Sequence, residues 1–269
     1  MKPTIRVALL DLNNKVANKG MGYLCQMMDT YSALDYEVFD VRHDGRIPDM
    51  SFDIYISSGG PGSPFDLESH WSEAYFAWID RLVAHNQTEE DKKHVFFICH
   101  SFQLACMHFQ IGEITERSSM KFGIFPVQKT AEADEVFDKL PTPFYAADFR
   151  YWQVKNSNPK ELQARGAKIL ALETVETEQT PALMAIRFTP EMIGTQFHPE
   201  ADEVGMKKYL VEDERKENII RDYGAAQYQT MLGSVQDDDK IALTFRTILP
   251  TFMRRAIEET DAHGVLLTV

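Results

Sequence analysis

One stretch of the sequence constrains the fold more than any other. Residues 94–98 form an apolar, β-prone run that stops at Cys99. Immediately after it, Phe102, Ala105 and Phe109 recur at helical spacing. This pattern predicts a strand that turns directly into a helix, with a thiol at the turn. In α/β proteins, active sites lie beyond the carboxyl ends of strands, so this position is suited to chemistry.

The same alternation runs through the first half of the chain. Strands are expected at residues 4–10, 36–41 and 52–57, and helices around residues 24–31 and 71–83. Strands that alternate with helices imply a mostly parallel sheet covered on both faces. Shorter strands that fit a small antiparallel edge are expected at residues 122–127, 144–149, 152–154, 169–172, 182–188 and 193–197.

The end of the chain is helical and charged. One helix is expected over residues 205–223, and apolar residues between Phe245 and Ile257 mark a second, which Pro250 is expected to kink or interrupt. The sequence therefore predicts one α/β domain over residues 1–204, with residues 205–269 as a helical C-terminal extension packed on the same domain.

Cys99 has the companions that nucleophilic catalysis needs. Much later in the chain, His198 and Glu200 stand two positions apart. A free thiol is mostly protonated near neutral pH, so an imidazole must take its proton and a carboxylate must orient the imidazole. A buried structural cysteine is the alternative for an isolated thiol. The three residue types together predict a Cys-His-Glu triad.

Three motifs resemble those of class I glutamine amidotransferases, over roughly residues 4–202. The elbow of that family reads Gly-x-Cys-x-Gly-x-Gln, and residues 97–103 here read Phe-Ile-Cys-His-Ser-Phe-Gln. The family's Gln-Phe-His-Pro-Glu motif is intact at residues 196–200, and residues 57–64, Ser-Ser-Gly-Gly-Pro-Gly-Ser-Pro, resemble its oxyanion loop. The resemblance implies a flavodoxin-like, three-layer α/β sandwich.

The resemblance also implies roles for these residues. Cys99 would attack the glutamine side-chain amide, giving a γ-glutamyl thioester and ammonia, with His198 as the base and Glu200 as its partner. The backbone N–H groups of Gly60 and His100 would form the oxyanion hole. The alternative for the glycine-rich loop is an ordinary tight turn.

Two further residues are candidates for substrate binding. Gln103 stands where the family contacts glutamine, and Arg150 could grip a carboxylate bidentately. A helix-surface glutamine and a plain exposed arginine are the alternatives. No cofactor is expected. A metal site built from Cys99, His94 and His100 is conceivable from the residue types, but the spacing matches no known site.

The elbow departs from the family at Phe97 and Ser101, which stand where glycine is usual. A nucleophile elbow is sharp, so its flanking residues must be small. Serine is small enough. The phenyl ring is predicted to be buried beside the following helix, with small neighbours that make room for it. A narrower or displaced glutamine pocket and weaker glutaminase activity would follow.

Composition limits the partners. The net charge of −13 argues against nucleic-acid binding, which needs clustered Lys and Arg. The chain has three cysteines, which cannot all pair, and shows neither a signal-peptide pattern nor a membrane-length apolar segment. A cytoplasmic location and no membrane contact are expected.

The leading hypothesis is a glutaminase-type amidotransferase whose substrate is glutamine. The sequence contains no recognisable synthetase domain, so a separate synthase subunit would accept the ammonia. The second hypothesis is a hydrolase of γ-glutamyl peptides or other γ-glutamyl amides. The third is a binding or regulatory protein that keeps the fold without turnover, and Phe97 is the feature that favours it.

Overall fold

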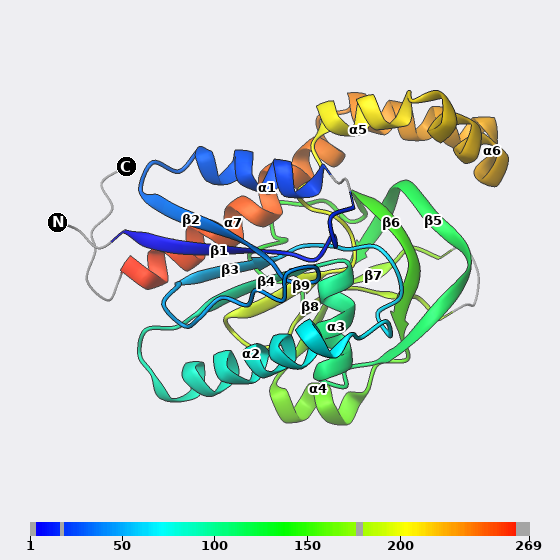
Figure 1. Ribbon diagram of the computed structural model, residues 1–269. Helices are drawn as coiled ribbons and strands as arrows, with labels where there is room; N and C mark the ends of the chain where they lie inside the picture. The colour runs from blue at the N-terminus through cyan, green and yellow to red at the C-terminus, as the bar shows by residue number, and fades with distance from the viewer. Residues whose placement is uncertain (1–3, 17–18, 176–179, 262–269) are drawn as a thin grey trace.

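The computed structural model describes residues 4–16, 19–175 and 180–261 (Figure 1). The strands of its sheet are β1 (Ile5–Asp11), β2 (Leu34–Asp40), β3 (Ile54–Ser57), β4 (His94–Ile98), β5 (Glu113–Lys129), β6 (Phe144–Lys155), β7 (Lys168–Glu173), β8 (Leu183–Arg187) and β9 (Met192–Thr195). The helices are α1 (Gly20–Asp29), α2 (Ser69–Thr88), α3 (His100–His108), α4 (Pro159–Arg165), α5 (Glu203–Leu210), α6 (Asp213–Gln236) and α7 (Ile241–Asp261).

The strands of the described residues form one sheet of nine strands, in the order β2-β1-β3-β4-β9-β8-β7-β5-β6. The neighbours from β2 to β9 are parallel, and the remaining neighbours, from β9 to β6, are antiparallel. Helices cover both faces of this sheet (Figure 1). The expected fold class is confirmed.

Two apolar clusters fill the space between the sheet and its helices. Helices α1 and α7 cover one face, and α2, α3 and α4 lie on the other (Figure 1). Because successive side chains of a buried strand point to opposite faces, Phe96 belongs to the first cluster and Phe97 to the second. Both faces of β4 are therefore covered, as its continuous apolar sequence indicates.

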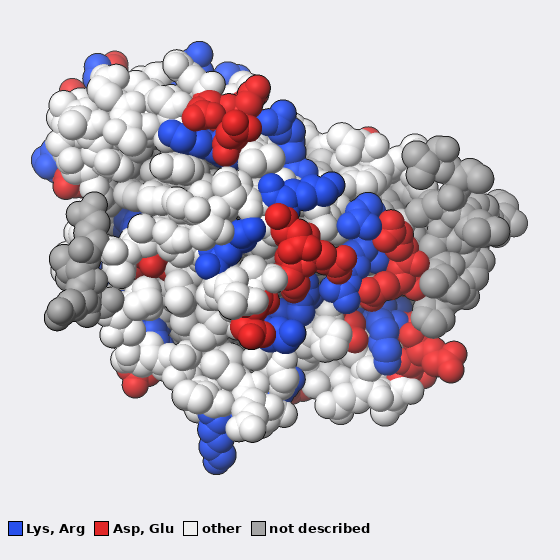
Figure 2. All heavy atoms as spheres, turned by 180° about the vertical axis from the view of Figure 1, so that it is seen from behind, with Lys and Arg blue, Asp and Glu red and all other residues white. Residues whose placement is uncertain are grey.

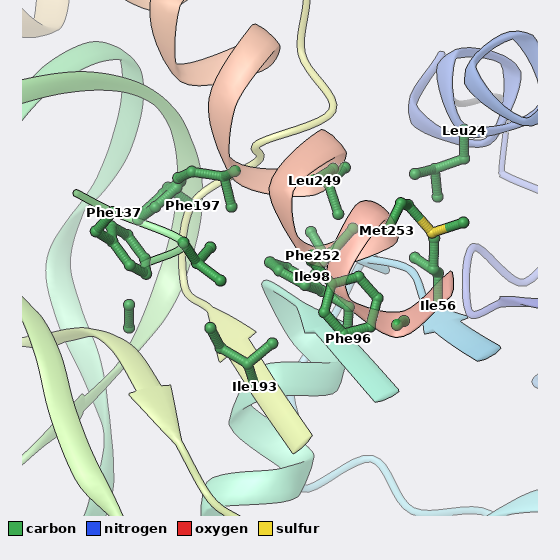
Figure 3. Packing of buried hydrophobic residues seen from close by; sticks show 14 of the residues in the cluster. Leu24, Ile56, Phe96, Ile98, Phe137, Ile193, Phe197, Leu249, Phe252 and Met253 are labelled. Carbon is green, nitrogen blue, oxygen red and sulfur yellow. The ribbon is translucent and has the colours of Figure 1, made fainter. Parts of the chain in front are cut away.

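Helix α7 lies deep in the first cluster. Figure 3 shows Leu249, Phe252 and Met253 of this helix beside Phe96 and Ile98 of β4. The rings of Phe252 and Phe96 are 5.2 Å apart, edge to face. These contacts support the proposal that residues 205–269 extend the domain formed by residues 1–204.

Helices α5 and α6 pack on the antiparallel part of the sheet. Their apolar residues form a third cluster with β5 and β6, and the members from the helices include Met206, Leu210, Ile219 and Met231. The single helix expected over residues 205–223 is wrong: α5 ends at Leu210 and α6 begins at Asp213. The hydroxyl of Tyr228 donates to the carbonyl of Leu210, which satisfies an acceptor at the end of α5.

Two other expectations differ from the structure. Residues 144–149 and 152–154 are parts of one strand, β6, because Arg150 is buried and ion-paired within it and does not end it. Helix α7 runs through Pro250 without interruption. An interior proline costs about 3 kcal/mol, and the residues on both sides of Pro250, Leu249 and Phe252, are buried in the first apolar cluster.

The surface charges are mixed in sign. Figure 2 shows Lys and Arg interspersed with Asp and Glu on the face opposite to that of Figure 1. On that face the described residues form no continuous basic surface of the kind that binds phosphate groups. Within the described residues, no helix is both long enough and apolar enough to cross a membrane.

Candidate active site

Cys99 lies at the turn between β4 and α3. Its backbone has a φ of 51° and a ψ of −98°, a conformation that residues other than glycine rarely adopt. The hydroxyl of Ser101 accepts from the N–H of Ile98 at 2.8 Å and donates to the carbonyl of Ser57 at 2.7 Å. Ser101 is therefore more than a small residue in the elbow, because its hydroxyl ties the turn to the end of β3.

The loop after β3 passes close to Cys99 and to the imidazole of His198. A Cβ at Gly59 would lie 2.9 Å from Cε1 of His198 and 3.4 Å from Cβ of Cys99. A Cβ at Gly60 would lie 2.4 Å from the carbonyl oxygen of Leu12. A side chain at Gly59 would therefore push the loop away from His198, and a side chain at Gly60 would push it away from the Leu12 carbonyl.

The imidazole of His198 joins the other two groups. Its Nδ1 lies 2.7 Å from Oε1 of Glu200, which leaves Nε2 for the thiol. Burial alone would lower the pKa of His198, but the Glu200 carboxylate and a hydrogen bond with the Cys99 thiol raise that pKa well above its ordinary value. The Glu200 carboxylate therefore favours the protonated, positively charged form of the His198 imidazole.

The two candidate oxyanion donors are the backbone N–H groups of Gly60 and His100. Among the described residues, no acceptor pairs with the backbone N–H of Gly60 or of His100. The His100 side chain has a different character. Burial and the charge of Arg42 lower its pKa to about 3. The imidazole of His100 is therefore neutral at physiological pH and supplies no positive charge to the thiol.

Gln103 is buried, with 3% of its surface exposed. Its Nε2 donates to the carbonyl of Trp152 at 2.9 Å and to Oε1 of Gln196 at 3.1 Å. Gln103 is not among the described residues that line the cavity beside Cys99. The structure therefore places this side chain away from the cavity, against Trp152 and Gln196.

Arg150 also lies away from that cavity. The alternative of a plain exposed arginine is wrong, since its side chain is 1% exposed. Its guanidinium group donates to Asp148 at 3.1 Å and forms an ion pair with Glu173 at 3.0 Å. Lys121 and Arg117 contact the same Glu173 carboxylate. Burial alone would raise the pKa of Glu173, but these cations lower it to about 2.

The cavity beside Cys99 has a volume of about 430 Å³, within the usual range for small-molecule sites. A row of side chains runs along it: the Phe149 ring lies 5.6 Å from the His198 ring and 5.5 Å from the Tyr209 ring, and the Arg215 guanidinium lies 4.8 Å from Tyr209. The sequence did not point to this wall. Part of it comes from α5, α6 and the residue just before α6, namely Gly205, Met206, Tyr209, Glu212 and Arg215.

Phe97 is fully buried, as predicted. Its ring lies edge to face with the rings of Trp78 and Phe188, at 6.4 and 5.9 Å. The expected small neighbour is Gly194, directly opposite on β9. The ring faces the α2 and α3 layer and is not among the described residues that line the cavity, so Phe97 gives no support to the expectation of a narrower or displaced glutamine pocket.

The described residues contain no group of three or more His, Cys, Asp or Glu side chains placed to hold a metal ion. Cys25 and Cys106 are free thiols, and Cys106 is fully buried in α3.

Comparison with known proteins gives one family match and several structural neighbours. The model of the family described as "Glutamine amidotransferase class-I" matches residues 19–218. The chain is similar to a glutamine amidotransferase from Thermotoga maritima, with a TM-score of 0.68, 14% identity, and coverage of 95% of this chain and 99% of the other. It is also similar to a glutamine amidotransferase from Methylobacillus flagellatus, with a TM-score of 0.63, 16% identity and coverage of 95% of both chains.

A third neighbour is a putative GMP synthase subunit from Thermoplasma acidophilum. Its TM-score is 0.50 at 15% identity, with coverage of 87% of this chain and 100% of the other. At these identities the three structures show a shared fold. No curated protein matches this chain in sequence.

Proposed function

This chain belongs to the glutamine amidotransferase class-I family, and we propose that it hydrolyses the side-chain amide of glutamine with Cys99 as the nucleophile. One observation carries the proposal. One nitrogen of the His198 imidazole is hydrogen-bonded to the Glu200 carboxylate, and the ring also interacts with the Cys99 thiol. The pKa of His198 is raised well above the ordinary value. A thiol beside such an imidazole is prepared to react as a thiolate.

In the first step the sulfur of Cys99 attacks the amide carbon, and the carbon–nitrogen bond then breaks. The imidazolium of His198 gives its proton to the departing nitrogen, which leaves as ammonia, and a γ-glutamyl thioester remains. His198 next takes a proton from water, whose oxygen attacks the thioester carbon and releases glutamate and the thiol. Glu200 stabilises the imidazolium in both steps.

The backbone N–H groups of Gly60 and His100 are proposed to stabilise the oxyanion that forms on the carbonyl oxygen. One such donor contributes about 3 kcal/mol to transition-state stabilisation. The absence of a protein acceptor for either N–H among the described residues supports this role.

The test is the release of glutamate and ammonia from glutamine by the purified chain. Cys99→Ala is expected to abolish turnover. Cys25→Ser serves as the matched control, because Cys25 is a free, half-buried thiol in α1. Equal rates for the wild type and Cys99→Ala would rule out the proposed nucleophile.

The ammonia acceptor is proposed to lie on a separate synthase subunit. Support comes from a structural neighbour that is itself described as a subunit of a synthase. A cytoplasmic location is proposed with it, because three free thiols suit a reducing compartment. A partner that co-purifies with the chain and increases glutamine turnover would agree with this proposal, whereas full activity of the isolated chain would argue against it.

A γ-glutamyl amide hydrolase is the second candidate, and the cavity favours it. Ammonia is a very small leaving group, whereas the cavity continues past His198 and Phe149 to Tyr209 and Arg215. An aromatic wall that ends in a guanidinium suits a γ-glutamyl conjugate whose amine part is apolar and carries a carboxylate.

A substrate comparison separates the two candidates. γ-Glutamyl-phenylalanine and glutamine would be compared as substrates in the wild type, in Tyr209→Ala and in the control Tyr151→Ala. Tyr151 is half exposed and is not among the described residues that line this cavity. If the protein is a hydrolase of conjugates, Tyr209→Ala is expected to hydrolyse γ-glutamyl-phenylalanine more slowly than the wild type and glutamine at the wild-type rate. Equal effects on both substrates would favour glutamine as the substrate.

The third hypothesis, a binding protein without turnover, depended on an obstructing Phe97. That ring is buried against Trp78 and Phe188, away from the cavity. This residue therefore gives the hypothesis no support.

A further inference from the structure

Two buried glutamine side chains connect a backbone carbonyl to the sulfur of Cys99. Nε2 of Gln103 donates to the carbonyl of Trp152 at 2.9 Å and to Oε1 of Gln196 at 3.1 Å. Nε2 of Gln196 in turn donates to Sγ of Cys99 at 3.8 Å, a hydrogen-bond distance for sulfur. Gln103 is 3% exposed and Gln196 is fully buried, so water does not compete for these bonds.

The direction of this chain of hydrogen bonds follows from its first member. A backbone carbonyl can only accept, so the amide nitrogen of Gln103 must face Trp152. The same nitrogen lies next to the side chain of Gln196, which must therefore present its oxygen. The NH₂ group of Gln196 is then left to face Cys99. Turning either amide over would bring two donors or two acceptors together in a buried site, at a cost of lost hydrogen bonds.

We propose that Gln196 is a catalytic residue that donates an N–H to the sulfur of Cys99 and stabilises the thiolate, and that Gln103 is the positioning residue that fixes the Gln196 amide. A hydrogen bond to the charged form of a group favours that form. The proposal deepens the proposed function and rests on Cys99 as its nucleophile. It also gives Gln103 a different role from the substrate contact that its place in the elbow motif suggests.

The other polar groups around the sulfur act in different directions. The Phe149 carbonyl accepts from the thiol at 3.8 Å, which favours the protonated form. The imidazole of His198, backed by Glu200, favours the thiolate. His100 follows Cys99 in the chain and is held neutral by burial and by Arg42. Gln196 supplies an N–H that stays in place whatever the protonation state of the imidazole, so it supports the thiolate before it attacks the amide and again when the thioester breaks.

The experiment measures the alkylation of Cys99 by iodoacetamide as a function of pH, followed by mass spectrometry of the full chain. Gln196→Leu is expected to move the midpoint of the profile upward by about one pH unit, a tenfold loss of thiolate below the midpoint. Gln103→Leu is expected to move this midpoint in the same direction, by a smaller amount than Gln196→Leu. The double variant is expected to match Gln196→Leu alone, since residues that act as one chain are not additive.

Gln196→Glu tests the donor separately from the shape. It keeps the size of the side chain and replaces the N–H donor with an oxygen, so it is expected to raise the midpoint further than Gln196→Leu. It also serves where Gln196→Leu does not fold, which circular dichroism reports. Gln153→Leu is the control. Gln153 is another buried glutamine, and its side chain accepts a hydrogen bond from Arg117. In this variant the pH midpoint of Cys99 alkylation is expected to equal that of the wild type.

The proposal would be overturned if Cys99 in Gln196→Leu and in Gln196→Glu were alkylated with the same pH midpoint as in the wild type. A residue with a purely structural role changes the stability of the protein and leaves this midpoint unchanged. The outcome is independent of glutamine turnover. A wild-type chain with no glutaminase activity and a shifted midpoint in the variants would contradict the proposed function and leave the hydrogen-bond chain supported.

Discussion

The side chain of Phe97 on β4 lies directly opposite Gly194 on β9, and the two strands can pair because Gly194 has no side chain. A Cβ at Gly194 would lie 3.0 Å from Cβ of Phe97, from its carbonyl oxygen and from the ring of Phe102. A phenylalanine in the elbow is therefore accommodated by a glycine on the neighbouring strand.

Gly194→Ala is expected to lower the free energy of unfolding by ~1–3 kcal/mol, because the added methyl group overpacks a filled site. Urea unfolding measures the change. Gly233→Ala is the control, since a Cβ at Gly233 in α6 meets nothing within 4 Å. A loss of the same size in both variants would show that the contact with Phe97 is not its cause.

Phe97→Leu is expected to lower the free energy of unfolding by about 1 kcal/mol and to leave kcat/KM for glutamine unchanged. The reason is that the ring packs on Trp78 and Phe188 and not on the cavity. Phe149→Leu is the contrasting variant, because Phe149 lines the cavity and lies against His198. A change in kcat/KM in Phe97→Leu equal to that in Phe149→Leu would contradict this assignment.

Glu200→Gln is expected to lower the pKa of His198, because it removes the carboxylate that outweighs the effect of burial. Glutamine turnover is expected to fall by ~10²-fold or more, the usual contribution of a positioned acid–base group. NMR titration of the His198 ring measures the pKa. Glu203→Gln, at an exposed position in α5, is the control. An unchanged His198 pKa would show that Glu200 does not stabilise the imidazolium.

The stability of the fold in acid is expected to depend on Glu173, whose pKa of about 2 lies below the ordinary value of 4.5. A lowered folded-state pKa stabilises the protein above pH 4.5, and this contribution is lost as the pH falls toward 2. The shift corresponds to about 3 kcal/mol.

The difference in unfolding free energy between the wild type and Glu173→Gln should therefore be largest at pH 7 and shrink between pH 4.5 and 2. Urea unfolding at several pH values measures it. The exposed Glu132 provides the control variant Glu132→Gln. A constant difference at all pH values would mean that the surrounding cations do not act on the charge of Glu173.

The parts of the fold that the sequence predicts well are those in which local pattern and tertiary contact agree. β4 reads as an apolar run because it is buried on both faces. β6 is harder to read, since Arg150 resembles a polar break and its partner, Glu173, lies on another strand. The same holds for the break at Val211, where α5 gives way to α6.

The site shows the same division. The motifs around Cys99 and His198 are contiguous in sequence and can be read directly. Other parts of the site depend on contacts between residues far apart in the chain. The Tyr209 ring packs against Phe149, and the side chain of Gln196 is held by Gln103. Neither pairing leaves a local pattern, because each depends on which strand ends the fold brings together.

The position of α7 has a consequence for biosynthesis. Leu249, Phe252 and Met253 complete the cover over β4, yet they are translated after all the described strands of the sheet. A nascent chain in which every strand is already made still carries an uncovered apolar face until α7 leaves the ribosome. Such exposed surface is prone to aggregation. Removal of α7 from the gene should therefore give an insoluble product even though the triad residues and every strand remain encoded.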